Sequence, residues 1–162
     1  TRTCGAFGDT VRVWDVDAGK ETAALPAIAM VPVLLPGDRV VTATGGEATV
    51  WDLASGKPLA TLKETGGNIH ALALSPDGSR LAEGSSSVIR VWDLSTYAGT
   101  VLADSHSGGE PEAGPVAEVE ALAWSPDGTR LAAGGYEALV RIWDVKSGKE
   151  VARFPASPPE KK

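Results

Sequence analysis

Residues Ile69–Leu94 read IHALALSPDGSRLAEGSSSVIRVWDL, and this stretch decides the fold class. It contains three short apolar runs that two turn signals separate. In the turn Ser75–Gly78, proline presets φ, aspartate can hydrogen-bond its own backbone, and glycine accepts a positive φ. The last run, Val88–Trp92, is rich in β-branched and aromatic residues. Because no run is long enough for a helix, the stretch predicts short β-strands joined by turns.

The same pattern recurs along the chain. Residues Val119–Val145 read VEALAWSPDGTRLAAGGYEALVRIWDV, with the same Ser-Pro-Asp-Gly turn and the same Trp-Asp pair. Shorter matches to the third strand occur at Thr10–Val16 and Ala48–Leu53. The Trp-Asp pair is present four times, as Trp14-Asp15, Trp51-Asp52, Trp92-Asp93 and Trp143-Asp144. A strand-built repeat of roughly 40 residues is typical of a propeller blade.

These motifs make the chain similar to the WD-repeat β-propeller family, and the resemblance extends from about Gly5 to Phe154. It implies an all-β fold, in which each blade has four antiparallel strands. The implied blades span about residues 1–25, 26–63, 67–103 and 118–154, and the first lacks its innermost strand. Residues 104–117 are expected to form an acidic, Gly- and Pro-rich loop, and residues 155–162 a tail.

Two strands are harder to place than the others. The innermost strand of the second blade is expected over Ile28–Leu35, but Pro32 lies inside this range. Proline removes a donor from the ladder, so we expect this strand to be bulged or poorly paired. The outer strand of the third blade is expected over Thr100–Leu102.

The number of blades leaves three alternatives open. Propellers close with about four to eight blades, and this chain supplies slightly fewer than four. The chain could be a fragment of a longer propeller, two copies could complete one ring, or a small ring could close alone. The chain opens in mid-repeat without an initiator methionine, which favours the fragment. An open arc would expose apolar blade faces, which favours pairing with a second copy.

Composition argues against several classes of partner. The net charge is −6 and no basic cluster is present, which argues against nucleic acid binding. The longest apolar run, Ala23–Leu35, contains two prolines and is shorter than the ~20 residues that a membrane helix needs. The single cysteine, Cys4, cannot form an internal disulfide. With no signal-peptide pattern, we expect a cytoplasmic location.

The sequence offers little material for catalysis. His70 and His106 are the two histidines, and no motif links either of them to Cys4 as a nucleophile pair. No glycine-rich phosphate loop is present. Four potential metal ligands fall in the loop: Asp104, His106, Glu110 and Glu112. Their spacing matches no known metal site, so we expect no metal, no cofactor and no catalytic residue.

The resemblance also implies a structural role for the tryptophans. In the family, the tryptophan joins a buried hydrogen-bond network with a His, a Ser or Thr, and an Asp. Carried over to the third blade, the His position is Thr65, and the Asp positions of the four blades are Gly8, Gly45, Ser86 and Glu137. Only Glu137 could imitate an aspartate. We therefore expect packing, rather than this network, to hold the blades together, because a buried indole stabilises through its large apolar area.

Partners in the family often contact the loops between the second and third strands and the start of the first strand. The resemblance places this surface on seven residues: Phe7, Met30, Thr44, His70, Ser85, Glu120 and Tyr136. An exposed Phe7 or Tyr136 would be notable, because aromatic residues are enriched at interface hot spots. The alternative is that each ring packs onto its own blade.

The sequence thus predicts a non-catalytic scaffold that binds other proteins or peptides, including a second copy of itself, and neither nucleic acid nor membrane. A second hypothesis is a sensory or regulatory segment of a multidomain signalling enzyme whose catalytic domain lies outside this sequence. A third is a hydrolase built on a propeller, for which Glu120, Glu137 and His70 are the available groups.

Overall fold

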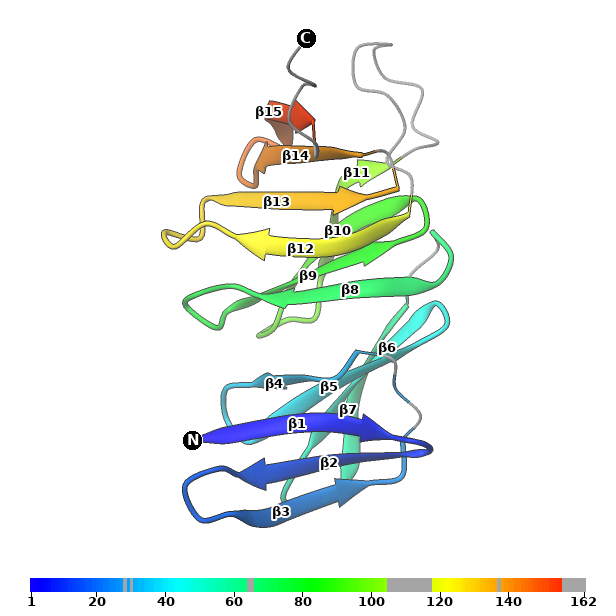
Figure 1. Ribbon diagram of the computed structural model, residues 1–162, viewed down its shortest axis with the longest axis vertical. Helices are drawn as coiled ribbons and strands as arrows, with labels where there is room; N and C mark the ends of the chain where they lie inside the picture. The colour runs from blue at the N-terminus through cyan, green and yellow to red at the C-terminus, as the bar shows by residue number, and fades with distance from the viewer. Residues whose placement is uncertain (28, 30, 64–65, 105–117, 137, 156–162) are drawn as a thin grey trace, which may run out of the picture. The chain divides into compact units, whose positions relative to one another are not determined.

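The computed structural model describes residues 1–27, 29, 31–63, 66–104, 118–136 and 138–155, and these residues form strands and turns with no helix. The strands make four antiparallel sheets, each built from strands that are consecutive in sequence (Figure 1). The chain divides into two compact units, Thr1–Glu64 and Thr65–Lys162, with two sheets in each. The predicted all-β class, with antiparallel sheets of the propeller-blade type, is confirmed.

The first sheet of unit 1 has three strands in the order β1 (Arg2–Phe7), β2 (Thr10–Asp15) and β3 (Lys20–Leu25). A two-residue turn at Gly8 and Asp9 joins β1 to β2, and the φ of Gly8 is 64°. Such a left-handed conformation favours glycine over any residue with a Cβ. The second sheet of this unit has the same kind of two-residue turn, in which the φ of Gly45 is 57°.

The second sheet of unit 1 corrects one expectation from the sequence. Its strands are β4 (Val33–Leu35), β5 (Arg39–Thr44), β6 (Glu47–Asp52) and β7 (Lys57–Lys63). The predicted innermost strand Ile28–Leu35 is wrong in extent, because pairing begins only after Pro32 and β4 has three residues. Ile28 and Met30 lie outside the described residues. Apolar side chains from both sheets form the core of this unit: Val11, Leu25, Ala27, Ala29 and Val40.

Unit 2 contains two complete four-stranded sheets. The first consists of β8 (Ile69–Leu74), β9 (Arg80–Ser85), β10 (Val88–Asp93) and β11 (Gly99–Asp104). The second consists of β12 (Val119–Trp124), β13 (Arg130–Gly135), β14 (Leu139–Asp144) and β15 (Lys149–Pro155). The outer strand β11 is longer than the predicted Thr100–Leu102.

The two sheets of unit 2 pack against each other, with β8 and β12 side by side (Figure 1). A shared apolar core joins them: Ala82, Ile89, Val91, Leu102, Val119, Leu131, Ala133 and Trp143. The two sheets approach each other closely at Gly84, where an added Cβ would lie 2.5 Å from Val119 Cγ1. Trp124 also donates from Nε1 to the backbone oxygen of Ala73, at 2.9 Å. Packing and hydrogen bonding therefore fix this pair of sheets.

The Ser-Pro-Asp-Gly turns hold their aspartates as hydrogen-bond acceptors. Asp127 accepts from Ser125 Oγ at 2.5 Å, and from the backbone nitrogen and hydroxyl of Thr129 at 3.0 and 2.9 Å. These bonds, that from Ser125 first, lower the pKa of Asp127 to about 2. Equivalent bonds in the first turn, that from the Ser75 side chain first, lower the pKa of Asp77 to about 2.

We expect acid to destabilise the protein between about pH 4 and pH 2. The folded pKa of these carboxyls lies below the usual 3.8, so they stabilise the fold above that pH and lose their contribution as pH falls through about 2. The melting temperature, followed by circular dichroism, should fall across this range. Asp127→Asn should make the fall shallower. A melting temperature that is constant from pH 4 to pH 2 would contradict this assignment.

Candidate functional site

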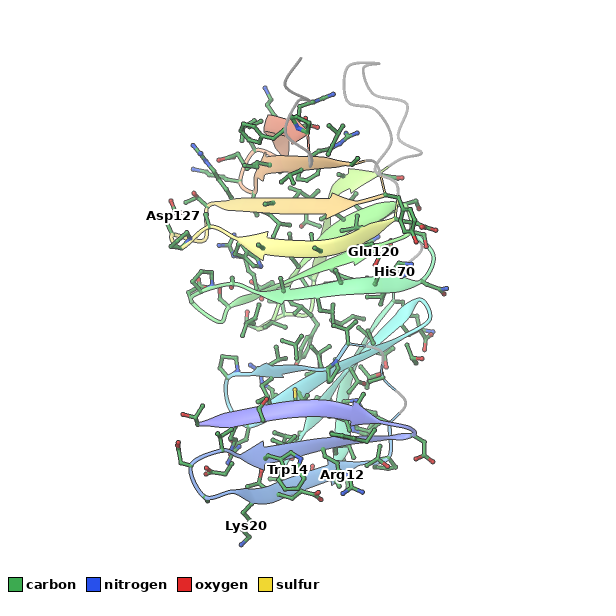
Figure 2. The ribbon with its side chains drawn as sticks, in the orientation of Figure 1. Arg12, Trp14, Lys20, His70, Glu120 and Asp127 are labelled. Atoms are coloured by element: carbon green, nitrogen blue, oxygen red, sulfur yellow. The ribbon has the colours of Figure 1, made fainter. Side chains whose placement is uncertain are left out.

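One end of unit 2 brings together strand ends from both of its sheets. Antiparallel pairing sets Ile69 opposite Ser85 and Val119 opposite Gly135, so the starts of β8 and β12 meet the ends of β9 and β13. Figure 2 shows His70 and Glu120 at this end and Asp127 at the other. We call this end the unit 2 rim and define it by five residues: His70, Ser86, Glu118, Glu120 and Tyr136.

Ser86 ties the rim together from the turn between β9 and β10. Its backbone nitrogen donates to the oxygen of Asn68 at 3.1 Å, and its backbone oxygen accepts from the nitrogen of Glu118 at 3.0 Å. Its hydroxyl lies 3.3 Å from Nε2 of His70. The rim backbone is therefore anchored to both first strands, and its side chains project from a fixed frame.

The charge of the rim is predominantly negative. Glu120 Oε1 lies 4.0 Å from Nδ1 of His70, and about half of the Glu120 side chain is exposed. Glu118 is also exposed and flanks Val119, the residue that pairs with Gly135. An ion pair as exposed as that of His70 and Glu120 contributes little to stability. The carboxylates of Glu118 and Glu120 can therefore contact the solvent or a partner.

Tyr136 is the most exposed large side chain of the rim, at 75%. The turn between β13 and β14 holds three residues, 136–138, whereas the matching turns of the other sheets hold two. By register, Gly135 rather than Tyr136 matches Ser85, and Tyr136 matches Ser86. The extra residue thus places the tyrosine in the turn. The assignment of Glu137 to the Asp position is out of register, and Glu137 itself lies outside the described residues.

Ser85 does not present its side chain to a partner, in contrast to the expectation from the sequence. It is fully buried, and its hydroxyl accepts from the backbone nitrogen of Val88 and donates to the backbone oxygen of the same residue, both at 3.1 Å. Ser85 therefore closes the turn between β9 and β10.

The remaining predicted contact residues lie in unit 1 or outside the described residues. Phe7, at the end of β1, is 59% exposed, and Thr44, at the end of β5, is also exposed. The Phe7 ring lies over Gly5, where an added Cβ would come within 3.2 Å of Cε2. It thus rests partly on its own strand. Met30 lies outside the described residues.

Two tryptophans of the Trp-Asp pairs do have side-chain hydrogen-bond partners, although we expected packing rather than a polar network to hold the blades together. Trp51 Nε1 donates to Thr42 Oγ1, and Trp92 Nε1 donates to Glu83 Oε2, each at 2.9 Å. Trp92 and Glu83 are both buried. In the sheet β8–β11, the buried carboxyl group of Glu83 is thus the acceptor for the indole.

The register between neighbouring strands explains the hydrogen bonds of Trp51 and Trp92, and it would have been enough to predict them. Trp92 pairs with Leu81, so Glu83 lies two residues further along the neighbouring strand, on the same face. The corresponding residues beside Trp14 and Trp143 are Gly5 and Ala133, which offer no side-chain acceptor. Within the described residues, neither of these two indoles donates a side-chain hydrogen bond. Thr65, the predicted His position, lies outside them.

The described residues offer little for catalysis or metal binding. No three His, Cys, Asp or Glu side chains gather there as a metal site would require, and His106, Glu110 and Glu112 fall outside the range. Burial raises the pKa of the Cys4 thiol, which disfavours the nucleophilic thiolate. In the same part of the chain no helix has the length and hydropathy to span a membrane.

Two family models match the chain. A model of the anaphase-promoting complex subunit 4 WD40 domain matches residues 86–160, and one of the WD domain, G-beta repeat, matches residues 56–93. A solved chain in a crystal structure of the mitotic checkpoint complex is similar with a TM-score of 0.74 and 20% sequence identity. The alignment covers 92% of this chain and 45% of that chain, so this chain spans less than half of its length.

These comparisons agree with the repeats and with the sheets. The likeness to the solved chain, at 20% identity, is one of fold. WD40 repeats are generally protein-interaction modules, and domains built from them are typically non-catalytic. With four Trp-Asp pairs, antiparallel sheets of consecutive strands and two WD40 models that together match residues 56–160, the chain is built from WD repeats that fold as β-propeller blades.

Proposed function

We propose that this chain is a non-catalytic protein-interaction scaffold that binds a partner protein or peptide at the unit 2 rim. The observation that carries the proposal is the 75% exposed ring of Tyr136, which follows directly on the strand paired with the segment of Glu118 and Glu120. Tyrosine supplies a large contact area at low entropic cost and is enriched at hot spots. The backbone anchored by Ser86 holds these groups in place without a partner.

The chemistry of the rim favours a partner segment that carries a basic side chain. Glu118 and Glu120 can accept hydrogen bonds from a guanidinium or an ammonium group. The face of Tyr136 can receive the same cation. In unit 1, Phe7 and Thr44 occupy comparable strand ends, and we propose them as a second contact region.

Tyr136→Ala should reduce the capture of a binding partner by about tenfold or more, as expected for a hot-spot tyrosine. The measurement is affinity capture with the immobilised chain, followed by binding titrations with the captured partner. Val101→Ala is the control, because Val101 is an exposed apolar residue on β11 of the same unit, outside the rim. Phe7→Ala tests the second contact region separately.

The outcome is interpretable only for folded variants, so each is first checked by a thermal melt. Capture that Tyr136→Ala leaves unchanged, with folding intact, would remove the rim from the binding site. Size exclusion with light scattering is run on the same samples. A mass near twice 16.6 kDa that Tyr136→Ala halves would identify a second copy of the chain as the partner.

A further inference from the structure

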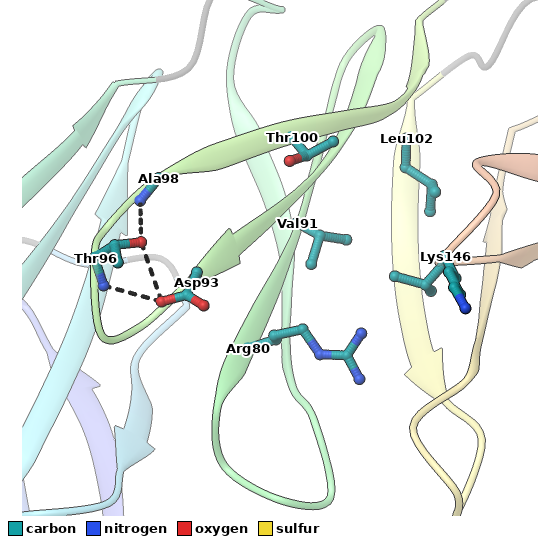
Figure 3. A pocket seen from close by; sticks show the side chains of 9 residues that line it. Arg80, Val91, Asp93, Thr96, Ala98, Thr100, Leu102 and Lys146 are labelled. Carbon is teal, nitrogen blue, oxygen red and sulfur yellow. Dashed lines mark hydrogen bonds between the residues drawn. The ribbon is translucent and has the colours of Figure 1, made fainter.

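A cavity of 460 Å³ opens between the two sheets of unit 2, at the end opposite the rim (Figure 3). One wall comes from β10, β11 and the turn between them, and the other from Val145 and Lys146, which follow β14. Arg80, at the start of β9, reaches into the same space. A volume of this size falls in the range that holds a few side chains or a small ligand.

Arg80 is held in place by contacts that leave part of its guanidinium available. Its Nη2 donates to the backbone oxygen of Gly128 at 2.7 Å, and the guanidinium carbon lies 4.8 Å from the ring centroid of Trp124. Lys146 is exposed. Among the residues that the structure describes, neither cation forms an ion pair with a carboxylate. The cavity therefore offers a pre-positioned guanidinium and a flexible ammonium group.

The carboxylate in the wall, Asp93, is engaged by its own turn. Its Oδ1 accepts from the backbone nitrogen and the hydroxyl of Ser95 at 2.8 and 2.6 Å. It also accepts from the backbone nitrogen and the hydroxyl of Thr96 at 2.9 and 3.1 Å (Figure 3). Among the charged residues that line the cavity, two are cations and one is this carboxylate. Asp77 and Asp144 also attract Arg80 and Lys146, but they lie outside the lining. The lining itself therefore presents two cationic groups to an anion.

The rest of the wall is largely apolar. Val91 and Leu102 are buried side chains on β10 and β11, and Val145 is half-buried beside Lys146. Thr100 adds a hydroxyl. A free inorganic anion would gain nothing from the aliphatic wall, whereas a carboxylate-bearing side chain next to an aliphatic one matches both surfaces.

We propose that this cavity binds a peptide segment of a partner protein in which an acidic side chain stands beside an aliphatic one. The carboxylate pairs with Lys146 and Arg80, and the aliphatic side chain packs on Leu102 and Val145. The site is separate from the unit 2 rim, so it can hold a second segment of the partner that the rim binds, or a different partner. If the cavity does not bind such a peptide, the proposal for the unit 2 rim is unaffected.

The test is a titration of the ¹⁵N-labelled 162-residue chain with the capped peptide acetyl-Gly-Leu-Glu-Val-Gly-amide, read by amide chemical shifts. We expect shifts at Leu102 and Val145, and a dissociation constant about fivefold higher for the peptide with Gln in place of Glu, as for a partly exposed charge pair. Lys146→Glu should raise it about tenfold or more, because the new charge repels the ligand.

Lys149→Glu makes the same change of charge on an exposed lysine of β15 that does not line the cavity, and it should alter the dissociation constant less than about twofold. Three outcomes would overturn the proposal: no shifts at the cavity, equal binding of the Gln peptide, or equal effects of Lys146→Glu and Lys149→Glu. Equal binding of N-acetylglutamate would also overturn it, since a free carboxylate would then suffice.

Discussion

Replacing Trp92 with phenylalanine is expected to lower the free energy of unfolding by about 3 kcal/mol, the sum of a small cavity and the cost of a buried carboxyl group that loses its hydrogen-bond donor. The indole nitrogen donates to Glu83 Oε2 at 2.9 Å, and both side chains are buried. Phenylalanine keeps most of the packing area but has no donor. The buried carboxyl group then loses the indole hydrogen bond, which offsets part of its desolvation.

Trp143→Phe is the matched control, because Trp143 is equally buried in the same unit and its indole donates no side-chain hydrogen bond within the described residues. It should cost about 1 kcal/mol, from the cavity alone. Both variants are compared by urea unfolding followed by circular dichroism. Adding Glu83→Met to Trp92→Phe should restore part of the loss, since removing both partners of a buried bond is milder than removing one. Equal losses for Trp92→Phe and Trp143→Phe would show that packing alone holds these tryptophans.

The second large effect is expected at Glu150, where alanine should lower the free energy of unfolding by about 3 kcal/mol. Glu150 Oε2 lies 3.4 Å from Nη1 of Arg141, and its Oε1 lies 2.6 Å from Nε of Arg153. The side chains of Arg141 and Glu150 are only 7% and 13% exposed. Removing the carboxylate takes away a counter-charge from a guanidinium that remains buried, which costs far more than an exposed pair would contribute.

The chain provides its own control in the first sheet. Arg12 and Glu21 are paired at 3.1 Å on β2 and β3, as Arg141 and Glu150 are on β14 and β15, but their side chains are 47% and 33% exposed. Glu21→Ala should therefore cost less than about 1 kcal/mol. Because the two pairs belong to different units, native-state hydrogen exchange of the strand amides reads each unit separately. A loss at Glu150 no larger than that at Glu21 would rule out burial as the source of the effect.

The sequence alone determined the class of fold, because its signals are local. A proline and a glycine set the backbone of the turn Ser75–Gly78, and β-branched runs such as Val88–Trp92 favour extended strands. The Trp-Asp pairs then mark the end of the third strand in each repeat. Each of these preferences acts within a few residues, so it can be read without knowledge of the neighbouring sheets.

Strand limits that depend on pairing were less accessible. The apolar stretch before Pro32 looks like strand by composition, but the ladder begins only at Val33 because the strand needs a partner at every position. The outer strand β11 was longer than its composition suggested, since pairing with β10 continues to Asp104. In both cases a hydrogen-bonding neighbour, not local preference, sets the end.

The candidate site was decided by tertiary structure. Counting back from each tryptophan treats Ser85 and Tyr136 as equivalent. Ser85, however, is buried at the end of β9, whereas one extra residue in the turn after β13 places Tyr136 in that turn, where it is exposed. The bond from Trp92 to Glu83 depends on which residues of two strands share a face. The cavity that places Arg80 near Lys146 depends on how two sheets pack. Register and packing join residues that are far apart in sequence, and a single inserted residue changes both, so only the folded structure shows which side chains meet.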